Sequence, residues 1–253
     1  TKTNFVIFHS QNKQMSKNIT LMINKKAIVE KKEVKYLGIT IDSVISWRPH
    51  IDKLTKTISR ALGVLYRIRS CVNIDILKTL YYALIYPHLS YAIEVWGSAD
   101  KIHIDKLLTL QKRIVRMITV SDRRRDDYSF PPSNPLFKQL GFLKVQDIFK
   151  LRLSNFIFRC LNKTSPVLFH SWFRTTTNIH QHRTRSKFVN IEENLNTRTL
   201  FIPSVRTTRY GLKQTKVLGA KIWNDLPRNL RTDNITITIF SKELKKYFIN
   251  QYL

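Results

Sequence analysis

The chain has 253 residues, of which 44 are Lys or Arg and 17 are Asp or Glu, so its formal net charge is +27 at pH 7. A charge of this size favours polyanionic partners, but ribosomal, histone-like and membrane-surface proteins share the same balance. The hydrophobic content of 43% is enough for a folded core, which excludes a disordered basic tail. No stretch approaches 18 uninterrupted apolar residues, and the N-terminus has no basic-then-apolar signal pattern, so neither a membrane span nor secretion is supported.

The first 46 residues predict a small antiparallel β unit. Strands are expected at residues 4–8, 19–23 and 34–41, with a turn at 24–26. Both faces of the last strand are largely apolar, which predicts that it is buried on both sides. Gly38 interrupts this strand and indicates a bulge or the close approach of another backbone.

A helical region is predicted for residues 47–121. Its first helix opens at Arg48, and apolar residues then recur every three or four positions. Asn73 is expected to cap a second helix, and Pro87 to begin a third, because a missing N–H is harmless in a first turn. The aromatic-rich residues 80–97 have helical spacing and few charges, which favours core packing over a base-stacking platform.

The remaining chain divides by composition into four segments. They are a Ser-, Pro-, Arg- and Asp-rich linker (122–135), a second helical unit (136–173) with its main helix at 145–162, a basic segment (174–216), and C-terminal helices (217–253). The basic segment has few aliphatic residues, so its burial cannot offset the entropy of ordering, and we expect it to be mobile until nucleic acid binds.

Two of the predicted helices carry basic stripes. The first stripe, on a face away from the apolar positions, consists of Lys53, Lys56, Arg60 and Arg67. The second, on a later helix, consists of Lys106, Lys112, Arg113 and Arg116. A charged stripe opposite a core is either an ordinary solvated face or a phosphate-binding surface, and the pattern alone leaves both interpretations open.

Candidate metal ligands are few. Asp126 and Asp127 are the only adjacent aspartates, in a polar loop where salt pairing with Arg123–Arg125 or solvation is favoured over metal binding. His180 and His182 lie two residues apart without further ligands nearby, so solvated loop residues are again the favoured interpretation.

Several short motifs follow one another in a characteristic order. They are KYLGITID (35–42), WRPHI (47–51), LYRIR (65–69), LYYALIYPHLSYAIEVWG (80–97), LQKRIVRMI (110–118), LFKQL (136–140), LKVQDIF (143–149) and AKIWNDLPR (220–228). Together they resemble the C-terminal part of the reverse transcriptase of non-LTR retrotransposons of the LINE type, especially the jockey-like group.

This resemblance implies roles for the parts of the chain. Residues 1–46 would be the end of the palm and the primer grip, the hairpin that holds the 3′ end of the growing strand, and 47–121 the thumb. By resemblance, Lys2 matches the lysine of the last palm motif, and Tyr36, Leu37 and Gly38 match the primer grip. The family's catalytic aspartates lie upstream of these motifs, so no catalytic residue and no cofactor are expected in this chain, whereas Mg²⁺ is expected for the intact parent enzyme.

The sequence thus predicts a mainly α fold with a small N-terminal antiparallel β unit. The resemblance implies that the chain is the nucleic-acid-binding C-terminal fragment of an RNA-directed DNA polymerase, and that this fragment is inactive alone. The expected partners are an RNA template and a DNA primer, with palm, fingers and an endonuclease domain in the parent protein, and no membrane. The predicted contacts are the three primer-grip residues, both basic stripes, Lys2, and Arg183, Arg185, Arg206 and Arg209 of the basic segment. Alternatives are a stand-alone or domesticated nucleic-acid-binding protein and a pseudogene product without function. Location is left open between the nucleus and a cytoplasmic ribonucleoprotein.

Overall fold

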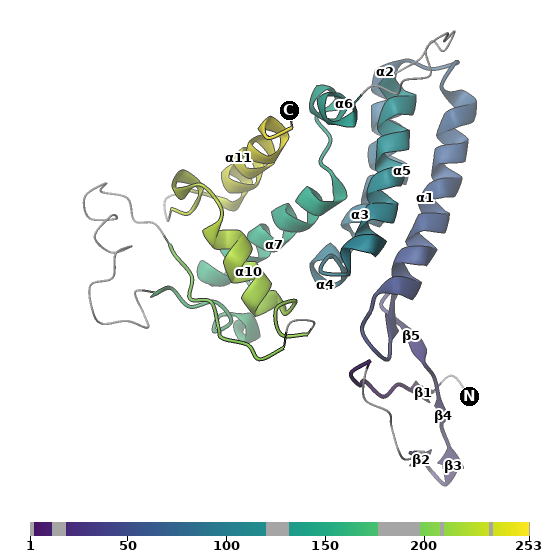
Figure 1. The fold of residues 1–253 in the computed structure, drawn as a ribbon, viewed down its shortest axis with the longest axis vertical. Coiled ribbons are helices and arrows are strands. Elements are labelled where there is room, and N and C mark those ends of the chain that lie inside the picture. Colours follow the sequence, from purple (N-terminus) through teal and green to yellow (C-terminus); the bar gives the residue numbers. More distant parts are fainter. Residues whose placement is uncertain are drawn as a thin grey trace. The chain divides into compact units, whose positions relative to one another are not determined.

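The computed structural model describes residues 3–11, 19–119, 132–176, 198–207, 210–232 and 235–252 (Figure 1). It has two compact units, one formed by Thr1–Ala92 and Ala99–Asp126 and the other by Ile93–Ser98 and Asp127–Leu253. Helices dominate, and strands occur near the N-terminus, so the predicted fold class is confirmed. Among the described residues, no helix combines the length and the apolar character needed to cross a membrane.

Several sequence predictions fall outside the described residues. These are the predictions for Lys2, for most of the 122–135 linker including Arg123–Arg125, Asp126 and Asp127, for residues 177–197 with His180, His182, Arg183 and Arg185, and for Arg209.

The β region of the first unit consists of two-stranded ladders. β1 (Asn4–Phe5) pairs with β4 (Val29–Glu30), β2 (Met22–Ile23) with β3 (Lys26–Ala27), and β5 (Glu33–Tyr36) with β6 (Ile39–Asp42). The β2–β3 turn lies at the predicted place, with positive φ at Asn24 and Lys25. The β1–β4 pair is parallel, which the predicted antiparallel unit did not include.

The predicted single strand at 34–41 is a hairpin, so that prediction was wrong. Leu37 (φ 44°) and Gly38 (φ 83°) both take left-handed conformations and form a two-residue turn, which places Tyr36 opposite Ile39. Burial on both faces is wrong too, because Tyr36 and Leu37 at the tip are 64% and 72% exposed. The alternation rule assumes a chain that keeps its direction, and the reversal at Gly38 breaks that assumption.

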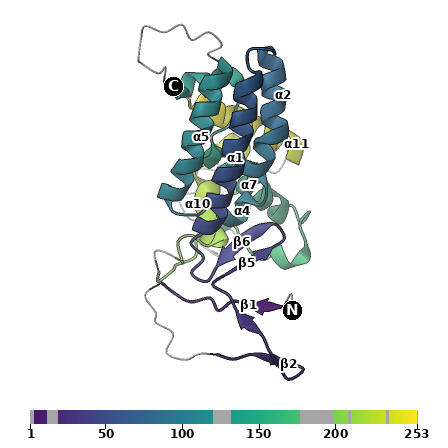
Figure 2. The same cartoon turned by 90° about the vertical axis from the view of Figure 1, so that its right-hand side faces the viewer.

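The described residues of the first unit also form the helices α1 (Arg48–Ile68), α2 (Ile74–Leu84), α3 (Tyr86–Ser90) and α5 (Lys101–Thr119). α1 and α5 lie side by side, and α2 contacts both (Figures 1 and 2). The predicted helix starts are confirmed. Pro49 lies in the first turn of α1, and the Asn73 side chain accepts a hydrogen bond from the Ile76 N–H at 2.9 Å.

The second unit is built around α7 (Val145–Leu161), which matches the predicted main helix. The other elements are α4 (Ile93–Trp96), α6 (Ser133–Leu140), η1 (Val167–Phe169), α10 (Thr215–Asn224), η2 (Arg228–Leu230) and α11 (Ile237–Asn250). α7 contacts α4, α10 and α11. Phe158 of α7 stacks on Phe240 of α11 with ring centroids 4.7 Å apart, which joins the C-terminal helix to this core.

Candidate nucleic-acid interface

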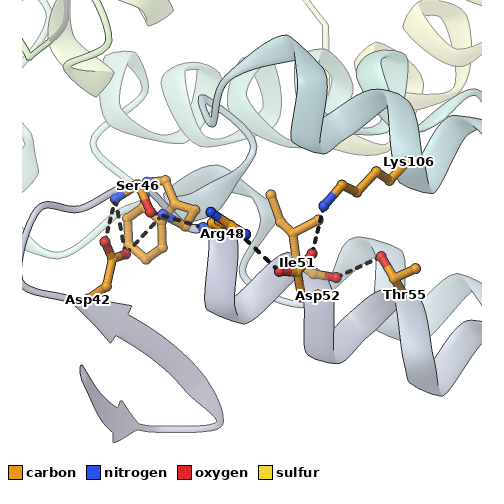
Figure 3. A network of polar contacts seen from close by, with 8 residues as sticks. Asp42, Ser46, Arg48, Ile51, Asp52, Thr55 and Lys106 are labelled. Atoms are coloured by element: carbon orange, nitrogen blue, oxygen red, sulfur yellow. Dashed lines mark hydrogen bonds and ion pairs between the residues drawn. The ribbon is translucent and has the colours of Figure 1, made fainter. Parts of the chain in front are cut away.

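A hydrogen-bonded corner connects the β5–β6 hairpin to α1 (Figure 3). The Asp42 carboxylate accepts hydrogen bonds from the Ser46 and Trp47 backbone N–H groups, each at 3.0 Å. The buried His50 ring adds a second link, because its Nδ1 accepts from the Thr40 N–H at 3.4 Å. These bonds fix the base of the hairpin to the first turn of α1, and they therefore define where the hairpin lies relative to the side chains of that helix.

The first basic stripe lies on the solvent side of α1. Lys53, Lys56, Arg60 and Arg67 are all exposed. Ile51, Ile58 and Leu65 of the same helix are fully buried. The predicted separation of the charged and apolar faces is therefore confirmed, while a contact with nucleic acid stays a prediction.

Acidic neighbours divide the stripe. The Lys53 ammonium lies 3.4 Å from a Glu33 carboxylate oxygen and donates to the Thr40 hydroxyl at 3.2 Å, so it is attached to the hairpin. Lys56, Arg60 and Arg67 form no ion pair with any residue that the structure describes. Among the cations of α1, these three therefore have no carboxylate partner in the described part of the chain.

The second stripe, on α5, is less available than the first. Lys106 donates to the Asp52 carboxylate at 2.9 Å, and Arg48 lies 3.7 Å from the other oxygen of that carboxylate (Figure 3). The hydrogen bond from Lys106 is the main reason that the pKa of Asp52 lies below its usual range. Arg113 is exposed, but Lys112 and Arg116 are only partly so. The cations of the second stripe are therefore less exposed than those of the first stripe on α1.

The hairpin tip has a support that the sequence did not reveal. The Tyr91 hydroxyl donates to the Leu37 carbonyl at 2.7 Å, and a Cβ placed on Gly38 would lie 3.4 Å from the Tyr91 ring. Gly38 did indicate a close approach, but the approaching group is a side chain rather than a backbone. No pattern in the sequence identifies Tyr91 as that group, because it lies 54 positions away.

The aromatic stretch at 80–97 contributes mainly to the core. Tyr81, Leu89 and Trp96 are buried. The Tyr81 hydroxyl accepts a hydrogen bond from Gln111 at 3.1 Å, and burial raises the pKa of Tyr81 well above its usual range. Core packing is thus confirmed for these residues, whereas Tyr82 and Tyr91 retain exposed surface.

The AKIWNDLPR motif holds residues 198–200, in the middle of the basic segment, against the second unit. The Asn224 side chain accepts from the Leu200 N–H and donates to the Leu200 carbonyl, both at 2.8 Å. The Trp223 indole N–H donates to the Arg198 carbonyl at 2.8 Å. Residues 198–200 are therefore bonded to the folded unit, whereas Arg206 lies exposed further along. Mobility of the basic segment stays a prediction.

No metal site emerges from the part of the chain that the structure describes. It contains no group of three or more His, Cys, Asp or Glu side chains that could hold a metal ion.

Comparisons with known proteins find relatives for about a third of the chain. No family model and no solved structure matches the chain. It is 31% identical over 100 residues to the RNA-directed DNA polymerase from mobile element jockey of Drosophila funebris, a match covering 38% of this chain and 11% of the relative. It is 30% identical over 90 residues to the probable RNA-directed DNA polymerase from transposon BS of Drosophila melanogaster, covering 34% and 10%. For the probable RNA-directed DNA polymerase from transposon X-element of the same species, the identity is 23% over 100 residues, covering 38% and 11%.

These matches confirm the resemblance to reverse transcriptases of jockey-like non-LTR mobile elements. The matched part of the chain spans about a tenth of the length of these curated relatives.

Proposed function

We propose that this chain is the duplex-holding part of an RNA-directed DNA polymerase, and that α1 and the β5–β6 hairpin contact an RNA template paired with a DNA primer. The observation that carries the proposal is the exposed basic face of α1, backed by a buried core and joined to a hairpin with an exposed apolar tip. The curated relatives supply the class of enzyme, and the geometry supplies the surface.

The dimensions of the basic face suit a duplex. Lys53 and Arg67 are 14 positions apart, which corresponds to about 21 Å along a helix. This length is several times the ~3.4 Å axial rise per nucleotide of one DNA strand, so the stripe is long enough to face more than one phosphate.

The charge pattern of α1 also favours phosphate over simple solvation. A solvated helix face commonly mixes both signs, which pair three or four positions apart. The α1 sequence has five Lys or Arg residues and only one acidic residue, Asp52. Asp52 contacts Arg48 and Lys106, both outside the stripe. The stripe is thus a concentration of like charge, and a polyanion lying along it would relieve the repulsion.

The test compares two variants that lose the same charge. One replaces Lys53, Lys56, Arg60 and Arg67 with Gln, and the control replaces the exposed residues Lys101, Lys138, Lys163 and Lys242 with Gln. Fluorescence anisotropy with a labelled RNA/DNA duplex should show an affinity loss of at least about tenfold for the α1 variant, and a much smaller loss for the control. Equal losses in the two variants would show that affinity depends on net charge alone and not on the position of the α1 side chains. Unchanged affinity of the α1 variant would leave the stripe as solvated surface.

A further inference from the structure

Tyr91 lies next to the turn of the β5–β6 hairpin. Its hydroxyl donates to the Leu37 carbonyl at 2.7 Å. Its ring lies beside Gly38, where an added Cβ would be 3.4 Å from Cε1 and 3.7 Å from the hydroxyl oxygen. Tyr91 is therefore hydrogen-bonded to Leu37, and its ring fills the space that a side chain at Gly38 would enter.

The backbone of Tyr91 is itself held in place. It follows α3, and its N–H donates to the Pro87 carbonyl at 2.9 Å. Ile85 and Leu89, at the start of α3 and within it, are fully buried. The hydroxyl consequently projects from a fixed point of the helical core.

The hairpin needs such a support because a two-stranded hairpin is only marginally stable in water. Its second strand, β6, is bonded through Asp42 and Thr40 to the start of α1 and to the Lys53 side chain. Its tip carries the exposed side chains of Tyr36 and Leu37, which bury too little surface to hold the turn in one place. The hydrogen bond from Tyr91 supplies the additional support that holds the turn in place.

We propose that Tyr91 is a positioning residue for nucleic-acid binding: it holds the Leu37–Gly38 turn so that the Tyr36 and Leu37 side chains are presented to the bound duplex in one orientation. This inference rests on the proposed function. Tyr91 acts through the turn and makes no contact of its own with nucleic acid.

The first test uses Tyr91→Phe in the full chain, which removes the hydroxyl and keeps the ring. Amide hydrogen exchange of residues 35–40 should become faster, and the affinity for an RNA/DNA duplex should fall about two- to tenfold, the equivalent of one hydrogen bond. Tyr247→Phe is the control. Tyr247 is partly exposed on α11 of the second unit, outside the proposed binding surface, and its hydroxyl forms no hydrogen bond with the described residues. It should change neither quantity.

The second test separates positioning from direct contact. In a background of Tyr36→Ala and Leu37→Ala, which removes the side chains that the turn presents, adding Tyr91→Phe should cause no further loss of affinity. An additive loss would make Tyr91 a contact residue and overturn the inference. Faster exchange with unchanged affinity would reduce Tyr91 to a structural support, and unchanged exchange would remove even that role. Failure of the unmodified chain to bind the duplex would instead refute the proposed function, and the positioning role with it.

Discussion

Replacement of Asn224 by Ala should destabilise the second unit, and the loss of stability should be large for a single polar substitution. The Asn224 amide pairs with both backbone groups of Leu200, in the manner of a neighbouring β-strand. Leu200 is 1% exposed, so water cannot replace those partners without rearrangement. The variant therefore leaves one buried donor and one buried acceptor unpaired.

The expected cost follows from these two groups. A buried polar group that loses its partner costs about 1–3 kcal/mol, so two would cost about 2–6 kcal/mol. Asn224 is itself partly exposed, and water entering the vacated space will reduce this penalty. We expect a decrease of about 2–4 kcal/mol in the free energy of unfolding. Asn224→Asp should be no better at pH 7, because it places a carboxylate oxygen against the Leu200 carbonyl.

Urea denaturation monitored by tryptophan fluorescence measures this change. Trp223 lies beside Asn224 and is buried, so its signal reports the unit that the substitution affects. Circular dichroism should be recorded as well, because the two units can unfold in separate transitions. Asn250→Ala, at the exposed end of α11, is the control and should stay within about 0.5 kcal/mol of the unmodified chain. A value for Asn224→Ala in that same range would refute the role assigned to the AKIWNDLPR motif.

Three further predictions concern the first unit and the chemistry. Burial, and then the charge of Lys53, lower the pKa of His50, so its neutral form is favoured in the folded state. The free energy of unfolding should therefore fall as the pH drops below about 6.5. Urea titrations at several pH values should show that His50→Gln weakens this pH dependence. The pKa of Asp52 is lowered, so its contribution to the free energy of unfolding should be present above about pH 4 and lost on acidification. Because the site is exposed, Asp52→Asn should lower the free energy of unfolding by less than about 1 kcal/mol at pH 7, and a larger decrease would contradict its description as an exposed ion pair. The chain itself should extend no primer on an RNA template with Mg²⁺ or Mn²⁺, since its only adjacent aspartates, Asp126 and Asp127, lie in a sequence unlike the polymerase hairpin; incorporation above a control without protein would show otherwise.

The sequence predicts the helices of this protein better than its contacts. The starts of α1 and α2 depend on Pro49 and Asn73, whose effects reach only the adjacent turn, so they are visible in the sequence. The β5–β6 turn was missed because Leu37, a residue without a turn preference, takes a left-handed conformation.

The candidate site was only partly predictable for a related reason. The spacing of the α1 charges shows that they share a face, and the structure confirms their exposure. The ion pairs that distinguish Lys53 and Lys106 from the other cations join residues 20 and 54 positions apart. The bond between Tyr91 and Leu37 spans 54 positions as well. Such pairings depend on how the helices pack, and no local pattern records them.

The salt dependence of duplex binding tests the role of α1 most directly. Each lost phosphate contact should flatten the plot of log affinity against log salt concentration by up to about 0.9. Replacing Lys56, Arg60 and Arg67 with Gln should therefore reduce the slope by up to about 2.7, and adding Lys53→Gln should change it less, because Lys53 is already bonded to Glu33 and Thr40. The same exchange at Lys101, Lys138 and Lys242 should leave the slope nearly unaltered. An unaltered slope in the α1 variant would contradict the proposal that this helix holds the duplex.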